Sequence, residues 1–266
     1  MSFSGKAIVV AALLLCVAGS ACKTSADKSG GNKNSNANSL AAKPDDKGII
    51  HSGSGEEKEK PAAGKANVAG KVLYNEQPAA NIEVKLCEKF NQYFGGCTGQ
   101  TFTAKTDAGG EYLIKNVPPG IYEGLTAKVF DTPYYVFATS GFVSSAKYEI
   151  EADQTFFAPD ANLFKSDLKL VSPKAGAKVD ASNLEVKWES YPDAAYYKFS
   201  IHPDSSTSAE TNYDYINKRI DGTSYVLDKP LAAGTYTCTV SAYNSNDIKL
   251  AVSPDDIKFT VAGGAK

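Results

Sequence analysis

The sequence is poor in the residues on which metal and nucleic-acid chemistry usually depend. It contains one methionine, one tryptophan, two histidines and a single arginine, Arg219. Two histidines exclude a metal centre with three histidine ligands, and any acid–base chemistry would have to use carboxylates, lysines or tyrosines. A formal net charge of −2 with one guanidinium group argues against a nucleic-acid partner, because such a partner needs a basic protein face.

Aromatic residues other than tryptophan are plentiful. The chain has 15 tyrosines and 12 phenylalanines among 266 residues, and 42% of its residues are hydrophobic. Aromatic side chains suit a pleated, half-buried surface, so this composition favours β structure. The length leaves room for about two domains once non-globular segments are set aside.

The first residues have the features of a secretion signal. Lys6 precedes an apolar run over residues 7–17, which is too short for the roughly 20 residues of a membrane span. Small residues then precede Cys22 and resemble a bacterial lipobox, with Gly19 where leucine is usual. The resemblance implies a signal peptide over residues 1–21 and a lipid on Cys22. An ordinary secretory signal and an uncleaved membrane span are the alternatives.

Residues 22–66 have the composition of a linker. They contain no aromatic residue, and their larger apolar side chains are Leu40, Ile49 and Ile50. Eight lysines alternate with six acidic residues over residues 23–66. Such a segment buries too little apolar area to offset its ordering entropy, so we expect a lipidated cysteine followed by a disordered tether.

Residues 67–165 show the pattern of a β-sandwich. Short alternating runs are separated by turn residues, and Asp107 can bond the local backbone donors of a glycine-containing turn. The segment resembles the carboxypeptidase regulatory-like domain, a transthyretin-like sandwich, in these motifs: Gly70-Lys71-Val72, Pro78-Ala79 with Ile82 to Leu86, Thr106 to Tyr112, and Pro119 to Tyr122.

The resemblance implies a non-catalytic module, because in the enzymes that name the family this domain accompanies a zinc peptidase. The sequence has no histidine cluster to bind such a zinc ion. Asp107 and Glu111 could be read as a catalytic or calcium-binding pair. Turn chemistry for Asp107 and an outward strand position for Glu111 explain them better.

Two cysteines of this segment bracket a short aromatic loop. Cys87 and Cys97 flank residues 88–96, which include Tyr93 and Phe94. Secretion favours thiol oxidation, so we expect a local Cys87–Cys97 disulfide. Closing so short a loop would stabilise the fold by about 3 kcal/mol.

Residues 166–262 show the pattern of a second sandwich, followed by a tail over residues 263–266. The segment resembles a fibronectin type III or immunoglobulin-like domain, in Leu184 to Trp188, Ala195 to Ile201 and Gly234 to Asn244. Trp188 is expected in the core. Cys238 has no partner cysteine on the expected opposite strand, and we interpret it as a buried, inert thiol.

Six aromatic residues are candidates for contact with a ligand, because they lie in polar loops or next to another aromatic residue. They are Tyr93, Phe94, Tyr134, Tyr135, Tyr213 and Tyr215. Exposed aromatic side chains can stack on sugars or anchor a protein partner. The competing interpretation is that the tyrosines cap the ends of the two cores.

The sequence therefore predicts an all-β protein with two tandem antiparallel β-sandwiches after a signal peptide and a tether. We expect a non-catalytic, membrane-anchored lipoprotein of the cell envelope, facing the periplasm or the cell exterior. Its expected role is binding or adhesion to a protein or a polysaccharide, with no cofactor, metal or nucleic acid. One alternative is a structural accessory subunit of an envelope or secretion assembly. A weaker one is a carbohydrate-active enzyme, which would need two carboxylates at a fixed separation.

Overall fold

The computed structural model describes residues 44–91, 96–137, 146–205, 207, 213–254 and 257–262. These residues form strands and loops, with one 3-10 turn, η1 (Tyr213–Tyr215), and no α-helix. Two separate hydrophobic cores are present, one with members from Ile50 to Leu163 and one with members from Leu168 to Val261. The predicted all-β class with two sandwiches is confirmed.

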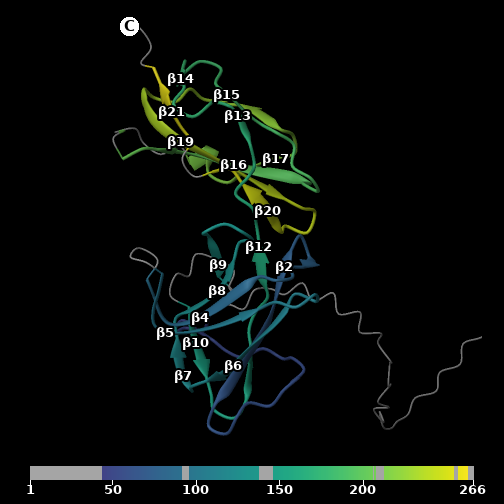
Figure 1. Cartoon of the computed structure of the whole chain (residues 1–266). Helices are drawn as coiled ribbons and strands as arrows, with labels where there is room; N and C mark the ends of the chain where they lie inside the picture. The colour runs from purple at the N-terminus through teal and green to yellow at the C-terminus, as the bar shows by residue number, and fades with distance from the viewer. Residues whose placement is uncertain are drawn as a thin grey trace, which may run out of the picture. The chain divides into compact units, whose positions relative to one another are not determined.

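The first sandwich is built from three groups of hydrogen-bonded strands (Figure 1). One group has the order β11-β2-β12, with β3 and β6 also paired to β2; the second is β5-β4-β8-β9; the third is β1-β10-β7. The strands are β1 (Ile49–Ile50), β2 (Ala66–Tyr74), β3 (Gln77–Pro78), β4 (Glu83–Asn91), β5 (Gly96–Lys105), β6 (Glu111–Val117), β7 (Gly120–Tyr122), β8 (Gly124–Lys128), β9 (Tyr135–Phe137), β10 (Lys147–Ile150), β11 (Thr155–Phe157) and β12 (Ala161–Leu163).

Alternation along the strands decides which side chains enter the first core. In β4, Val84 and Leu86 are buried while Glu83 and Lys85 are only partly covered. The turn before β6 forms as the sequence predicts, because Asp107 Oδ1 accepts hydrogen bonds from the backbone N–H groups of Gly109 (2.8 Å) and Glu111 (2.9 Å). Gly110 in this turn has a φ of 71°, which glycine adopts without a steric penalty.

The second sandwich consists of two sheets. One has the order β13-β15-β18, and the other has the order β14-β21-β19-β16-β17, with β20 paired to β19. The strands are β13 (Leu170–Ser172), β14 (Lys178–Val179), β15 (Glu185–Trp188), β16 (Tyr196–Pro203), β17 (Lys218–Ile220), β18 (Ser224–Val226), β19 (Gly234–Tyr243), β20 (Lys249–Val252) and β21 (Lys258–Val261). Strand pairing is mostly antiparallel in both sandwiches, but β1/β10, β11/β2, β12/β2 and β14/β21 are parallel.

Trp188 and Cys238 both lie in the second core. Trp188 is 3% exposed, and its ring lies 5.4 Å from that of Tyr197. Cys238 is fully buried with a free thiol. Burial raises the pKa of this thiol to about 12, so it stays protonated and unreactive at neutral pH.

The expected tether needs correction from residue 44 onward, because this part lies along the first sandwich. β1 pairs in parallel with β10, and Ile50 is fully buried in the core. Gly53 N–H donates to the carbonyl oxygen of Phe157 (2.8 Å), and Phe157 N–H donates to Ser52 Oγ (2.9 Å). The physical reason is that backbone hydrogen bonds to existing strands, together with one buried isoleucine, offset the ordering entropy.

The expected signal peptide and lipid-bearing Cys22 lie outside the described residues, as does the tail over residues 263–266. Within the part of the chain that the structure describes, no helix has the length and apolar character needed to span a membrane.

Candidate functional site

One face of the sheet β5-β4-β8-β9 gathers aromatic and charged side chains away from the first core. We call it the outer face and define it by Glu83, Lys85, Phe90, Tyr135 and Phe137. In β9, Val136 is 8% exposed and belongs to the core, so its neighbours Tyr135 and Phe137 point to the opposite side. The register pairs Lys85 with Thr126 and Thr126 with Phe137, which places Lys85 and Phe137 in one row across three strands.

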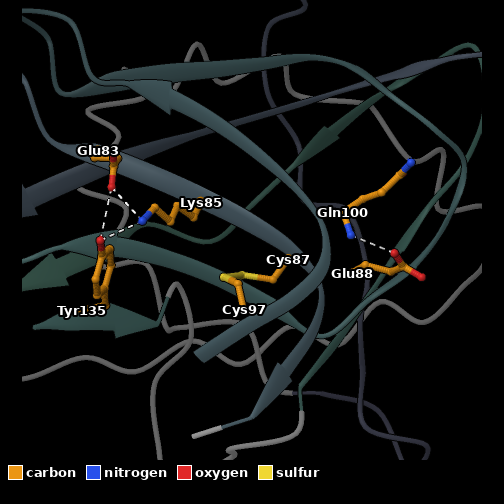
Figure 2. The surroundings of a disulfide bond; sticks show 7 residues. All are labelled: Glu83, Lys85, Cys87, Glu88, Cys97, Gln100 and Tyr135. Atoms are coloured by element: carbon orange, nitrogen blue, oxygen red, sulfur yellow. Dashed lines mark hydrogen bonds and ion pairs between the residues drawn. A yellow bond between two sulfur atoms is a disulfide. The ribbon is translucent and has the colours of Figure 1, made fainter. Parts of the chain in front are cut away.

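Three side chains of the outer face form a closed polar cluster, whose members Figure 2 joins by dashed lines. The ammonium group of Lys85 donates a hydrogen bond to Tyr135 Oη (2.9 Å) and lies 3.1 Å from Glu83 Oε1. The hydroxyl of Tyr135 in turn donates to Glu83 Oε1 (3.2 Å). The lysine nitrogen also lies 4.9 Å from the centre of the tyrosine ring. These contacts fix the ring while leaving Tyr135 37% exposed.

The cluster keeps both of its charges over the physiological pH range. The hydrogen bond from Lys85 is the main factor that lowers the pKa of Glu83, and Tyr135 contributes in the same direction. The hydrogen bond to Tyr135, followed by that to Glu83, raises the pKa of Lys85. The outer face therefore presents an ammonium group, a carboxylate and a phenol hydroxyl in fixed positions.

Phe90 and Phe137 extend the outer face as an apolar surface. Their ring centres are 4.9 Å apart in an edge-to-face arrangement. Phe90 packs directly on Gly124 of the neighbouring strand, where a Cβ atom would lie 3.0 Å from the phenylalanine side chain. A glycine at this position thus allows the phenylalanine ring to lie close to the sheet.

The disulfide lies on the same sheet, between β4 and β5 (Figure 2). Cys87 and Cys97 are joined, with their Cα atoms 5.3 Å apart. Glu88, next to this disulfide, accepts a hydrogen bond from the backbone N–H of Gln100 (2.9 Å). The strands that frame the loop are thereby held together on the sheet that carries the Tyr135 cluster.

The six aromatic candidates have different outcomes. Tyr135 belongs to the outer face, and Tyr134, which precedes it, is 60% exposed. Tyr93 and Phe94 lie outside the described residues. Tyr213 lies in η1, the turn that also contains Tyr215.

Tyr215 is wrong as a ligand-contact residue, because it is fully buried in the second core. Its hydroxyl accepts a hydrogen bond from Lys229 N–H (2.8 Å) and donates to the carbonyl oxygen of the same residue (3.2 Å). These bonds satisfy the hydroxyl inside the protein, so the polar residues around Tyr215 in the sequence do not indicate exposure.

Sequence reasoning missed Glu83, Lys85, Phe90 and Phe137. Glu83 and Lys85 flank Val84 in an alternating strand, and this pattern indicates an outward direction for both. Their proximity to Tyr135 depends on the pairing of β4, β8 and β9, which a single sequence does not reveal. Among the described residues, no group of three or more histidine, cysteine, aspartate or glutamate side chains is arranged to hold a metal ion.

Comparison with known proteins gives distant likenesses only. No family model and no curated protein matches the sequence. A proposed carbohydrate-binding protein from Bacteroides uniformis ATCC 8492 has 12% identity and a TM-score of 0.27, over 71% of this chain and 97% of that chain. The fibronectin(III)-like modules of CbhA from Clostridium thermocellum have 18% identity and a TM-score of 0.27, over 76% and 92% of the two chains.

A streptococcal ancillary pilin has 15% identity and a TM-score of 0.27, over 75% of this chain and 59% of that chain. The chain resembles these solved structures only at low sequence identity. With such TM-scores, none of them carries an argument about what this protein binds.

Proposed function

We propose that this chain is a non-catalytic binding module that holds a polysaccharide on the outer face. The observation that carries the proposal is the partly exposed ring of Tyr135, fixed by Lys85 and Glu83 on a sheet that also carries Phe90 and Phe137. A sugar ring has an apolar C–H face that packs on an aromatic ring, and hydroxyl groups that pair with fixed donors and acceptors.

The geometry favours binding because its parts are already in position. A side chain that is fixed before the ligand arrives loses less rotamer freedom on binding. Tyr135 is held by two hydrogen-bond partners, and Lys85 by both members of the cluster. The outer face also lies on a sheet, which is a more rigid support than a loop.

We propose further that lipid on Cys22 holds the module at the cell envelope, facing the periplasm or the exterior. The lipobox-like residues and the short apolar run support this placement. The motifs that resemble carboxypeptidase regulatory-like and fibronectin type III domains fit a modular, non-catalytic envelope protein. Globomycin treatment of the producing cell tests the anchor. We expect the unprocessed precursor to accumulate, and its absence would contradict lipidation.

Binding is tested with residues 38–266, which contain both hydrophobic cores. On a glycan array, the unmodified protein should retain a polysaccharide. Tyr135→Ala should weaken this binding at least about fivefold, which corresponds to about 1 kcal/mol. Tyr135→Phe, which keeps the ring, should weaken it less. The matched control is Tyr225→Phe, which removes a hydroxyl from the Lys218–Tyr225–Asp228 cluster of the second sandwich and should leave binding unchanged.

Two results would replace this proposal. Mild crosslinking that yields a stoichiometric envelope complex, together with no glycan retained on the array, would favour the structural accessory role. Turnover of a polysaccharide by the purified module would show an enzyme.

A further inference from the structure

A pocket of the first sandwich lies on a different sheet from the outer face. Strands β2, β6 and β11, together with residues 54–58, surround a pocket with a cavity volume of about 390 Å³. This volume lies near the lower end of the range for small-molecule sites, roughly 300–1,000 Å³. The pocket is therefore sized for a small ligand.

The charges that line the pocket do not balance. Four carboxylates and two ammonium groups line it: Glu56, Asp107, Glu111, Asp160, Lys58 and Lys71. Glu111 accepts a hydrogen bond from Lys58, and its Oε1 lies 3.6 Å from Lys71 Nζ, so it pairs with both lysines. Asp107 accepts the backbone hydrogen bonds of the turn before β6. The pocket therefore keeps an excess of negative charge.

Asp160 is the half-buried carboxylate of this set. Within the described part of the chain, it accepts no hydrogen bond and has no partner at ion-pair distance. Burial raises its pKa, and Lys71 partly opposes this effect. A carboxylate in such surroundings gains from a cation that enters the pocket and pairs with it.

Tyr112 lies in the pocket wall with its hydroxyl enclosed by the protein. The residue lines the pocket and is 4% exposed, and among the described residues its hydroxyl has no hydrogen-bond partner. Gly70, also in the lining, leaves room for it, because a Cβ atom there would lie 2.5 Å from Tyr112 Oη. Burial is the main cause of the raised pKa of Tyr112, followed by Tyr148 and then Asp160, so the hydroxyl stays neutral near that carboxylate. Less than 1 Å² of the hydroxyl oxygen is exposed, so Tyr112 bounds the pocket without bonding to a ligand inside it.

Phe157 gives the pocket an aromatic wall. Its ring is half-buried and lies directly against Gly55, where a Cβ atom would approach the ring to 2.2 Å. Its backbone is hydrogen-bonded on both sides to residues 52 and 53. The pocket thus combines an aromatic ring and an unpaired carboxylate.

We propose that this pocket binds an amino sugar with a protonated primary amine. The ammonium group pairs with Asp160, and the apolar face of the sugar ring packs on Phe157. The site is separate from the outer face and goes beyond the polysaccharide binding proposed there.

Calorimetric titration of residues 38–266 with three simple sugars tests the proposal. D-Glucosamine should bind saturably near neutral pH and low ionic strength. N-Acetyl-D-glucosamine, whose amine is capped, and D-glucose, which has none, should bind at least about tenfold more weakly, because neither can pair with the carboxylate. Absence of saturable binding, or equal binding of the three sugars, would overturn the proposal. Equal binding of 1,5-diaminopentane would overturn its sugar component.

One variant locates the site. Asp160→Asn keeps the side-chain shape and should weaken glucosamine binding at least about tenfold. Asp131→Asn is the matched control: it removes an exposed carboxylate of the same sandwich outside the pocket and should leave binding unchanged. Melting curves check folding, and amide chemical-shift changes in the unmodified protein locate the site independently. Unaltered affinity in Asp160→Asn, or shifts confined to other residues, would contradict the assignment.

Discussion

Each sandwich carries a cluster of one lysine, one tyrosine and one carboxylate, and the two clusters have different neighbours. In the first sandwich the members are Lys85, Tyr135 and Glu83. In the second, Lys218 donates to both Tyr225 and Asp228, and Tyr225 donates to Asp228. Both lysine nitrogens lie over the tyrosine ring of their cluster, at 4.9 Å and 4.4 Å from its centre.

The ring of the second cluster packs against a core, whereas the ring of the first lies on a surface. Tyr225 has its ring centre 5.1 Å from that of Phe199 and 6.4 Å from that of Tyr215, and both of these residues are fully buried. Tyr135 projects from the opposite side of β9 to the core residue Val136. The same hydrogen-bonding groups therefore close a core in one sandwich and hold an aromatic surface in the other. The packing of the ring, and not its hydroxyl chemistry, distinguishes the two roles.

The largest effect that separates the two regions is expected at Tyr215. Tyr215→Ala should destabilise the second sandwich by about 3–5 kcal/mol, because it leaves a cavity beside Phe199 and removes the hydrogen bonds to Lys229. Tyr135→Ala should cost less than about 1 kcal/mol, because its ring is on the surface. Urea unfolding followed by the fluorescence of Trp188, the single tryptophan, reports on the second sandwich. If Tyr215→Ala lowers the stability of the second sandwich by less than about 1 kcal/mol, the core ring of Tyr215 would contribute no more than the surface ring of Tyr135.

The next effect concerns the disulfide of the first sandwich. Replacing Cys87 and Cys97 by serine should destabilise this sandwich by about 3 kcal/mol, because a short loop is no longer closed in the unfolded chain. Hydrogen exchange of β4 and β5 should accelerate, while the unfolding transition of Trp188 should not move.

The oxidation state itself is checked by alkylation of residues 38–266 at pH 8. Without reductant and denaturant no thiol should react, because Cys238 is buried and its pKa is raised to about 12. Quantitative modification of Cys87 and Cys97 in the native, unreduced protein would contradict the disulfide.

The sequence predicts the local features of the fold well. Alternation in residues 82–86 indicates the inward side of β4, and the Asp107 turn follows from side-chain chemistry that acts within a few residues. The position of Trp188 in a core also follows from its strand pattern. In each case the controlling interactions are local or depend only on hydrophobic period.

The features that the sequence does not predict depend on contacts between segments that are far apart in the chain. Composition alone does not reveal that β1, which contains Ile50, pairs with β10, about a hundred residues later in the chain. A polar neighbourhood makes Tyr215 look exposed, although Lys229 satisfies its hydroxyl inside the fold. The Tyr135 cluster depends on strand register, and the amino-sugar pocket depends on which strands meet around Tyr112. Neither register nor strand order is encoded in a local pattern.

A third prediction tests how the aromatic surface is built. Gly124→Ala should destabilise the first sandwich by about 1–2 kcal/mol, because the added Cβ atom would lie 3.0 Å from Phe90 and force its ring from the sheet. Gly124→Ala should also weaken glycan binding, because Phe90 belongs to the outer face. Gly222→Ala is the matched control in the second sandwich, since nothing lies within 4 Å of its added Cβ atom, and its effect should stay within about 0.5 kcal/mol. Equal effects of the two substitutions would show that Phe90 does not depend on close approach to β8.

The smallest expected effect is the pH dependence of the Glu83 cluster. The pKa of Glu83 is lowered in the folded protein, chiefly by Lys85, so the folded state binds its proton less tightly than the unfolded state. The resulting stability is complete above the ordinary value of 4.5 and is lost as the pH falls through the lower, folded value. Because this carboxylate is partly exposed, the effect should stay within the range for surface pairs, about 0.2–1 kcal/mol.

Glu83→Gln should therefore reduce the loss of stability of the first sandwich between pH 6 and pH 3, measured by hydrogen exchange of β4. It should leave the acid response of the second sandwich unchanged, because Asp228, whose pKa Lys218 lowers, remains there and is followed through Trp188. An unchanged slope in the first sandwich would mean that Lys85 gives Glu83 no more stabilisation than solvent does. The hydrogen bond that Lys85 donates to Tyr135 would then be the contact that fixes the ring.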